Sequence, residues 1–170
     1  MKRVLSCSQD PACTFDSLNT SAANSKIEKT ILIHERYRTL ISTKGRYALR
    51  IMMDLAQHGE SGNIALKDIA ERQRISKKYL EIIVRDLVKG GLLEGTSGKG
   101  GGYRLCRRPE DYTAFEIIEV TEGTLAPVAC LEENAAACPL APDCHTLPMW
   151  KEYYQLTRDF FSGKRLSDLI

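Results

Sequence analysis

Apolar residues recur at three- and four-residue spacings from Thr43 onward, which predicts a series of short amphipathic helices. The first runs to about His58, and a short second helix ends near Gln73. A third begins after Ser76, a suitable N-cap, and stops at Gly90. So brief a turn between the second and third helices is typical of a helix-turn-helix unit.

A glycine-rich segment follows the third helix and predicts a small β-hairpin. Its strands would lie at 92–94 and 103–105, with the tip in the glycines from Gly95 to Gly102. A phosphate-binding loop for a nucleotide is the rival interpretation. Such a loop needs Gly-Lys-Ser/Thr at the start of a helix, whereas Lys99 is followed by a glycine and then a strand. We therefore expect residues 43–106 to form a winged helix-turn-helix.

The pattern changes beyond the hairpin. A fourth amphipathic helix is predicted from Thr113 to about Gly123, and a final helix from Pro148 to its stop at Gly163. The final helix carries a stripe too wide and too aromatic for a solvent-facing surface, so we expect it to form a dimer. Packing within the core of a monomer is the alternative. The residues expected in the dimer interface are Met149, Trp150, Tyr153, Tyr154, Phe160 and Phe161.

These elements predict a mainly α fold with a small β-hairpin wing. A winged helix-turn-helix DNA-binding domain would occupy residues 42–123, a cysteine-bearing cluster loop residues 124–145, and a long C-terminal dimerisation helix with its tail residues 146–170. Residues 1–41 are rich in Ser, Asn and Thr and have no clean period. We interpret them as a mobile or accessory extension, or as an artefact of the assigned start.

The net charge of +2 is a cancellation between two unlike parts of the chain. Residues 43–108 hold fourteen Lys or Arg against seven Asp or Glu, whereas residues 109–150 hold eight acidic residues and no Lys or Arg. A basic block of this kind is typical of a domain that binds a polyanion such as DNA. Six cysteines without an apolar signal segment, and no apolar run long enough for a membrane span, predict a soluble, reduced, cytoplasmic protein with no membrane partner.

The candidate DNA contacts cluster at the predicted recognition helix, the wing and the first helix. The start of a recognition helix presents free N–H groups and side chains to the groove, and a glycine-rich wing lets its lysine approach a phosphate. A merely solvated charged face is the alternative. The candidates are Lys44, Arg46, Arg50, Ser76, Lys77, Lys78, Tyr79, Arg85, Lys99, Gly100 and Gly101.

Three thiols and an imidazole, from Cys130, Cys138, Cys144 and His145, lie within sixteen residues of a proline-rich stretch that should form a loop. Thiolates bind soft metals and iron–sulfur clusters, so this loop is a candidate metal site. Structural zinc and unligated thiols remain as alternatives, although zinc ligands usually pair at closer spacing. The other three cysteines are not expected to bind a metal. We expect Cys7 and Cys13 to be surface thiols in the N-terminal extension and Cys106 to be a small packing residue.

Five motifs in one order, together with the three late cysteines, resemble the Rrf2 family of bacterial regulators over about residues 42–170. The motifs are Ser42–Arg50, Asp68–Gln73, Ile75–Glu81, Gly90–Leu92 and Gly98–Leu105. The resemblance implies a homodimer of winged-helix units that binds double-stranded operator DNA and is joined by the C-terminal helix. It also implies a 2Fe-2S or 4Fe-4S cluster on cysteines spaced like Cys130, Cys138 and Cys144, with 2Fe-2S preferred.

The fourth ligand differs between branches of that family. The position of the IscR-branch histidine is Leu147 here, and the position of the NsrR-branch aspartate is Arg46. His145 is the nearest candidate in this chain, and Asp143, Glu132, Glu133 or an external ligand are the alternatives.

The expected function is a transcriptional regulator whose operator affinity is controlled by the cluster, which would sense redox state, iron–sulfur status or nitric oxide. A cluster-free regulator controlled by a protein or metabolite partner, as in the CymR branch, is the alternative, and a small iron–sulfur redox protein is a third. No general acid–base or nucleophile arrangement accompanies the thiols, so we expect no enzymatic activity.

Overall fold

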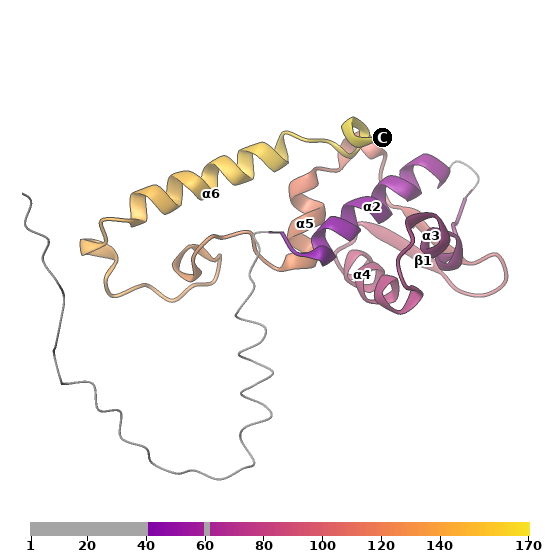
Figure 1. The fold of residues 1–170 in the computed structure, drawn as a ribbon, viewed down its shortest axis with the longest axis horizontal. Coiled ribbons are helices and arrows are strands. Elements are labelled where there is room, and N and C mark those ends of the chain that lie inside the picture. The colour runs from indigo at the N-terminus through magenta and orange to yellow at the C-terminus, as the bar shows by residue number, and fades with distance from the viewer. Residues whose placement is uncertain (1–40, 60–61) are drawn as a thin grey trace, which may run out of the picture. The chain divides into compact units, whose positions relative to one another are not determined.

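The computed structural model describes residues 41–59 and 62–170 (Figure 1). The predicted N-terminal extension, with Cys7 and Cys13, lies outside the described residues except for Ile41. The helices are α2 (Thr43–His58), α3 (Leu66–Gln73), α4 (Lys77–Lys89), α5 (Ala114–Glu122) and α6 (Leu147–Ser162), and the strands are β1 (Leu93–Thr96) and β2 (Gly102–Leu105). Within the described ranges, no helix is both long enough and apolar enough to cross a membrane.

Helices α2 and α4 begin and end where local chemistry predicts, whereas α3 has no side-chain cap at Ala65 and ends at the C-cap Arg74, whose φ is 53°. Ser42 and Ser76 are the N-caps of α2 and α4, and each side chain accepts a hydrogen bond from a backbone N–H in the first turn. Gly90 follows the last turn of α4. The hairpin is antiparallel, with Leu93 opposite Leu105 and Thr96 opposite Gly102. The predicted mainly helical fold with a two-stranded wing is therefore confirmed.

The core lies between α2, α3, α4 and α5. Its fully buried apolar side chains are Ala48, Ile51, Met52, Ile69, Leu80, Ile83, Val84, Leu87, Ile117, Ile118 and Leu166. Tyr112 is also fully buried, and its hydroxyl donates to the carbonyl of Leu92 at 2.9 Å. This bond fixes the segment before α5 to the start of the wing.

The chain returns to this core after α6. The N–H of Leu166 donates to the carbonyl of Tyr112 at 3.0 Å, and the N–H of Ala114 donates to the carbonyl of Lys164 at 2.8 Å. In Figure 1 the C-terminal turn accordingly lies beside the start of α5. The C-terminal tail is thus packed on the winged-helix core, a feature for which the sequence carries no local signal.

Candidate nucleic-acid interface and cysteine site

The first turn of α4 exposes the side chains predicted to contact DNA. Ser76, Lys77 and Lys78 are all exposed, and no acidic residue lies in that turn. The backbone N–H groups of a first helical turn have no partner within the helix, and the helix dipole adds partial positive charge there. Arg85 is exposed further along the same helix. This end of α4 is therefore suited to a phosphate or to a base edge.

The wing tip is built by glycines in conformations that other residues avoid. Gly98 and Gly100 have φ of 96° and 78°, and Lys99 lies exposed between them. A side chain at Gly101 would collide with the carbonyl oxygen of Thr96. The backbone of the tip can thus approach another molecule closely, and Lys99 is exposed there.

Three residues of α2 that were predicted to contact DNA have cationic groups that already bond to other residues of the protein. Lys44 forms an ion pair with Asp86 at 2.6 Å and donates to the carbonyl of Thr121 at 2.8 Å. The exposed guanidinium of Arg46 donates to the Thr43 hydroxyl at 3.0 Å, and that of Arg50 donates to the side chain and carbonyl of Gln73. The partners of Lys44 and Arg50 are distant in sequence, whereas Thr43 lies one helical turn before Arg46. With an ion pair and a hydrogen bond to its ammonium, Lys44 is the least available of the three.

Tyr79, predicted at the same surface, is half-buried and packs edge-on against Tyr47 with ring centroids 5.9 Å apart. The guanidinium of Arg50 lies 5.3 Å from the centroid of the Tyr47 ring. The two tyrosines therefore connect α2 to the first turn of α4. In this arrangement the Tyr79 ring packs beneath the candidate DNA-binding surface and does not project from it.

The three late cysteines lie around one pocket of about 290 Å³. Leu147 and Lys151 of α6 line it as well, whereas His145 is exposed and is not among its lining residues. No three Cys, His, Asp or Glu of the described ranges are grouped closely enough for a single metal ion. Three cysteines around one pocket supply the kind of soft thiolate donors that iron–sulfur clusters take.

Cys144 is the thiol that the structure favours as an anion. Hydrogen bonds from the Thr146 hydroxyl, 3.5 Å from the sulfur, and from the N–H groups of Thr146 and Leu147 hold the pKa of Cys144 below its ordinary value. The thiolate is the form that binds metals. Cys106 is exposed, so the packing role expected for it is wrong.

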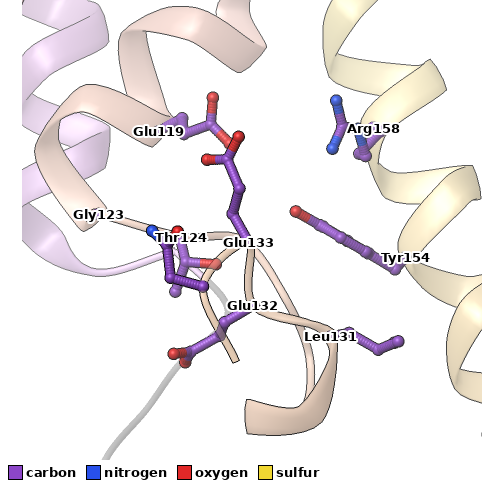
Figure 2. Close-up of a pocket in the computed structure, with 9 residues that line it drawn as sticks. Glu119, Gly123, Thr124, Leu131, Glu132, Glu133, Tyr154 and Arg158 are labelled. Atoms are coloured by element: carbon purple, nitrogen blue, oxygen red, sulfur yellow. The ribbon is translucent and has the colours of Figure 1, made fainter. Parts of the chain in front are cut away.

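A second pocket, of about 350 Å³, lies where the cysteine loop meets α5 and α6. Figure 2 shows the carboxylates of Glu119 and Glu133 close to one another, with Tyr154 and Arg158 of α6 facing them. Burial raises the pKa of Glu119, an effect that Arg158 opposes and Glu133 reinforces. Sequence reasoning did not identify this pocket, because its residues are spread over three elements.

The predicted interface residues of α6 fall on two faces. Tyr154 and Phe161 pack against Phe115, Ile118 and Leu125, and the guanidinium of Arg158 lies 5.1 Å from the centroid of the Phe115 ring. Trp150 is half-buried and packs edge-on against Tyr153. The outer face exposes 52% of Met149, 40% of Tyr153, 62% of Leu156 and 58% of Phe160. Leu156 was not predicted, although its spacing completes the stripe.

Comparison with known proteins gives consistent matches over this region. A family model described as "Rrf2: Iron-dependent Transcriptional regulator" matches residues 41–170. The chain is 41% identical over 130 residues to Protein rrf2 of Nitratidesulfovibrio vulgaris, covering 76% of this chain and 86% of the relative.

Two solved structures are similar to this chain. The structure of CymR, the global cysteine regulator of B. subtilis, has a TM-score of 0.60 at 36% identity and covers 76% of this chain and 94% of CymR. The structure of T. potens IscR has a TM-score of 0.58 at 32% identity and covers 80% of this chain and 88% of IscR.

Proposed function

Since this chain belongs to the Rrf2 family of transcriptional regulators, we propose that it is a cytoplasmic homodimer whose affinity for operator DNA is controlled by an iron–sulfur cluster on Cys130, Cys138 and Cys144. The family assignment confirms the resemblance inferred from the motifs, and it identifies the chain as a regulator and not an enzyme. The cluster, the homodimer and the individual contact residues are the parts that we propose.

The observation that carries the cluster proposal is that all three late cysteines line one pocket. The description of the matching family as iron-dependent supports it. Glu132 also lines this pocket, whereas His145 does not, which supports Glu132 as an alternative to His145 for the fourth ligand. When bound, the cluster would supply the sensitivity to oxidants, iron–sulfur status or nitric oxide, and 2Fe-2S remains the preferred type.

The cysteine loop has little apolar burial to hold its fold. None of residues 127–146 is buried, and only two short 3₁₀ turns, Ala129–Leu131 and Ala141–Asp143, interrupt its irregular path. A segment of this kind gains order mainly from ligation, because shared ligands restrict it where packing does not. Release of the thiolates would therefore free the segment between α5 and α6.

In the proposed dimer the two recognition helices address half-sites about one turn of DNA apart. The exposed stripe of α6 would set their separation. A small change in the relative placement of the two helices would then lower affinity, which makes control by population shift between two arrangements possible. Under this proposal, Lys77, Lys78 and Lys99 contact DNA directly.

A cluster-free regulator controlled by a protein or metabolite partner is the second candidate. It is favoured by the similarity to the CymR structure and by the exposure of Cys130. Iron and sulfide analysis of anaerobically purified protein separates the two candidates.

Cys138→Ala tests the cluster directly. We expect anaerobically purified wild-type protein to be coloured and the variant to be colourless, because the half-buried Cys138 lies between the other two ligands in sequence. The operator affinity of the variant should equal that of cluster-free wild type, and the two wild-type forms should differ by about tenfold. Cys106→Ala, which removes a thiol outside the pocket, should remain coloured. Wild-type protein without iron under these conditions would refute the cluster.

Lys99→Ala tests the wing. Loss of one phosphate contact should weaken binding to all DNA sequences alike and lower the slope of log affinity against log salt by about one unit. Lys67→Ala, which removes an exposed lysine of α3 outside the proposed surface, should leave the slope unchanged. The same slope in wild type and Lys99→Ala would exclude a wing contact.

A further inference from the structure

The last turn of α5 caps the first turn of α2. One oxygen of Glu122, the last residue of α5, accepts hydrogen bonds from the Ser42 N–H at 3.0 Å, the Ser42 hydroxyl at 2.7 Å and the Gly45 N–H at 3.0 Å. A carboxylate in this position satisfies free N–H groups and interacts favourably with the helix dipole. Gly45 permits the approach, because a Cβ there would lie 2.5 Å from that oxygen.

Lys44 connects the same turn of α5 to the recognition helix. Its ammonium donates to the carbonyl of Thr121 at 2.8 Å and pairs with Asp86 of α4 at 2.6 Å. A second contact joins α5 to the end of α4. The side chain of Val120 packs so closely on Gly90 that a Cβ at Gly90 would lie 2.6 Å from it. The end of α5 is therefore fixed to the start of α2 and to the second half of α4.

The cysteine loop begins directly after this junction. Gly123 follows α5 with φ of 83°, and Thr124 already lines the pocket that contains Glu133 of the loop. Chain connectivity places any displacement at the start of the loop next to Glu122. The contacts of Glu122 and Lys44 would transmit such a displacement to α2 and α4.

On the basis of the proposed function, we propose that Glu122 and Lys44 are positioning residues that carry a change in the cysteine loop to the recognition helix, and that Lys44 does not contact DNA. Its ammonium already has a carboxylate and a carbonyl as partners, and the group is only partly exposed. To reach a phosphate it would have to leave both. Lys44, which the sequence predicts as a DNA contact, thus connects α5 to α4 within the protein.

Glu122→Gln and Lys44→Met test the link on an operator fragment that the wild-type protein selects from genomic DNA. The dissociation constant is measured for cluster-loaded and cluster-free protein at three salt concentrations. Allosteric coupling is typically about 5- to 150-fold, and in both variants we expect the ratio of the two constants to fall below about 2. The salt slope, the iron content and the visible spectrum should match wild type, since neither residue lines the cysteine pocket.

Lys77→Met is the matched control, because it removes an exposed lysine of α4. It should lower the salt slope by about one unit and keep the wild-type ratio. If Lys44→Met behaves like this control, Lys44 is a DNA contact and the proposal fails. A wild-type ratio in both Glu122→Gln and Lys44→Met would also overturn it.

Hydrogen exchange separates failure of the link from failure of the cluster hypothesis. If wild-type protein carries no iron, the proposed function fails, and the link is tested by amide exchange in Glu122→Gln. Faster exchange in both α4 and residues 124–128 supports the link. Faster exchange confined to the first turn of α2 would show that Glu122 is only a local cap.

Discussion

Leu156→Asp should convert the proposed dimer into a monomer with at least about 100-fold weaker operator binding, because both half-sites must be occupied together. The side chain is 62% exposed in the isolated chain and lies in the outer stripe of α6 with Met149, Tyr153 and Phe160. These residues follow one another at intervals of four, three and four, the spacing of a helix–helix seam. A two-fold axis would place the substitution in the interface twice.

Burial of one leucine contributes about 1.5–3 kcal/mol, so loss of two leucines together with the burial of two carboxylates should weaken dimerisation by at least about a thousandfold. Sedimentation equilibrium over a range of protein concentrations measures this change. Leu140→Asp makes the same chemical change at a leucine that is 73% exposed in the cysteine loop, and it should remain dimeric. A dimeric Leu156→Asp would place the interface elsewhere.

The elements of the fold could be predicted from the sequence because their signals are local. The period of α2 and α4, the N-caps Ser42 and Ser76 and the glycines of the hairpin all lie within a few residues of the structure they determine. The outcome for α6 was different. The width of its aromatic stripe predicted a dimer interface, with packing in the monomer's own core as the alternative. The contacts of Tyr154 with Phe115 and Ile118 show that one side of the stripe faces the chain's own core.

The candidate site was less predictable, because partners distant in sequence decide it. Lys44 looks like any exposed basic residue until Asp86 and Thr121 are brought beside it. Spacing identified the three cysteines, whereas the exposure of His145 and the place of Lys151 in the pocket depend on how α6 begins. The local sequence pattern therefore indicated which residues are candidates for the sites, and the tertiary contacts show which groups each of them bonds to.

Arg72→Met should lower the free energy of unfolding by about 3 kcal/mol at pH 7, because it removes the cation that donates hydrogen bonds to a buried carboxylate. Asp54 of α2 is fully buried, and Arg72 of α3 donates to both of its oxygens, with the closest contact at 2.6 Å. Gln73 donates to the same carboxylate at 2.9 Å. These bonds fix the end of α3 directly before the turn that leads to α4. Lys67→Met removes an exposed cation from the same helix and should change stability by less than about 0.5 kcal/mol.

The pH dependence identifies the carboxylate as the cause. Burial alone would raise the pKa of Asp54, but the hydrogen bonds and charge of Arg72, with Gln73, hold it below its ordinary value. The contribution of Asp54 to wild-type stability is therefore complete above the pKa of an aspartate in the unfolded chain, about 3.9. This contribution is lost as pH falls through the lower pKa of Asp54 in the folded state. In Arg72→Met burial dominates and the pKa of Asp54 rises, so the folded state binds the proton more tightly than the unfolded state.

The stability difference between wild type and Arg72→Met should consequently be largest at neutral pH and decrease as pH approaches 4. Urea unfolding at pH 7 and pH 4.5 measures it. Adding Asp54→Asn to Arg72→Met removes the unpaired charge and keeps a polar partner for Gln73. The double variant should be more stable than Arg72→Met at pH 7, with a pH dependence that no longer includes this site. A stability difference independent of pH would mean that Arg72 acts by packing its aliphatic stem and not through the charge of Asp54.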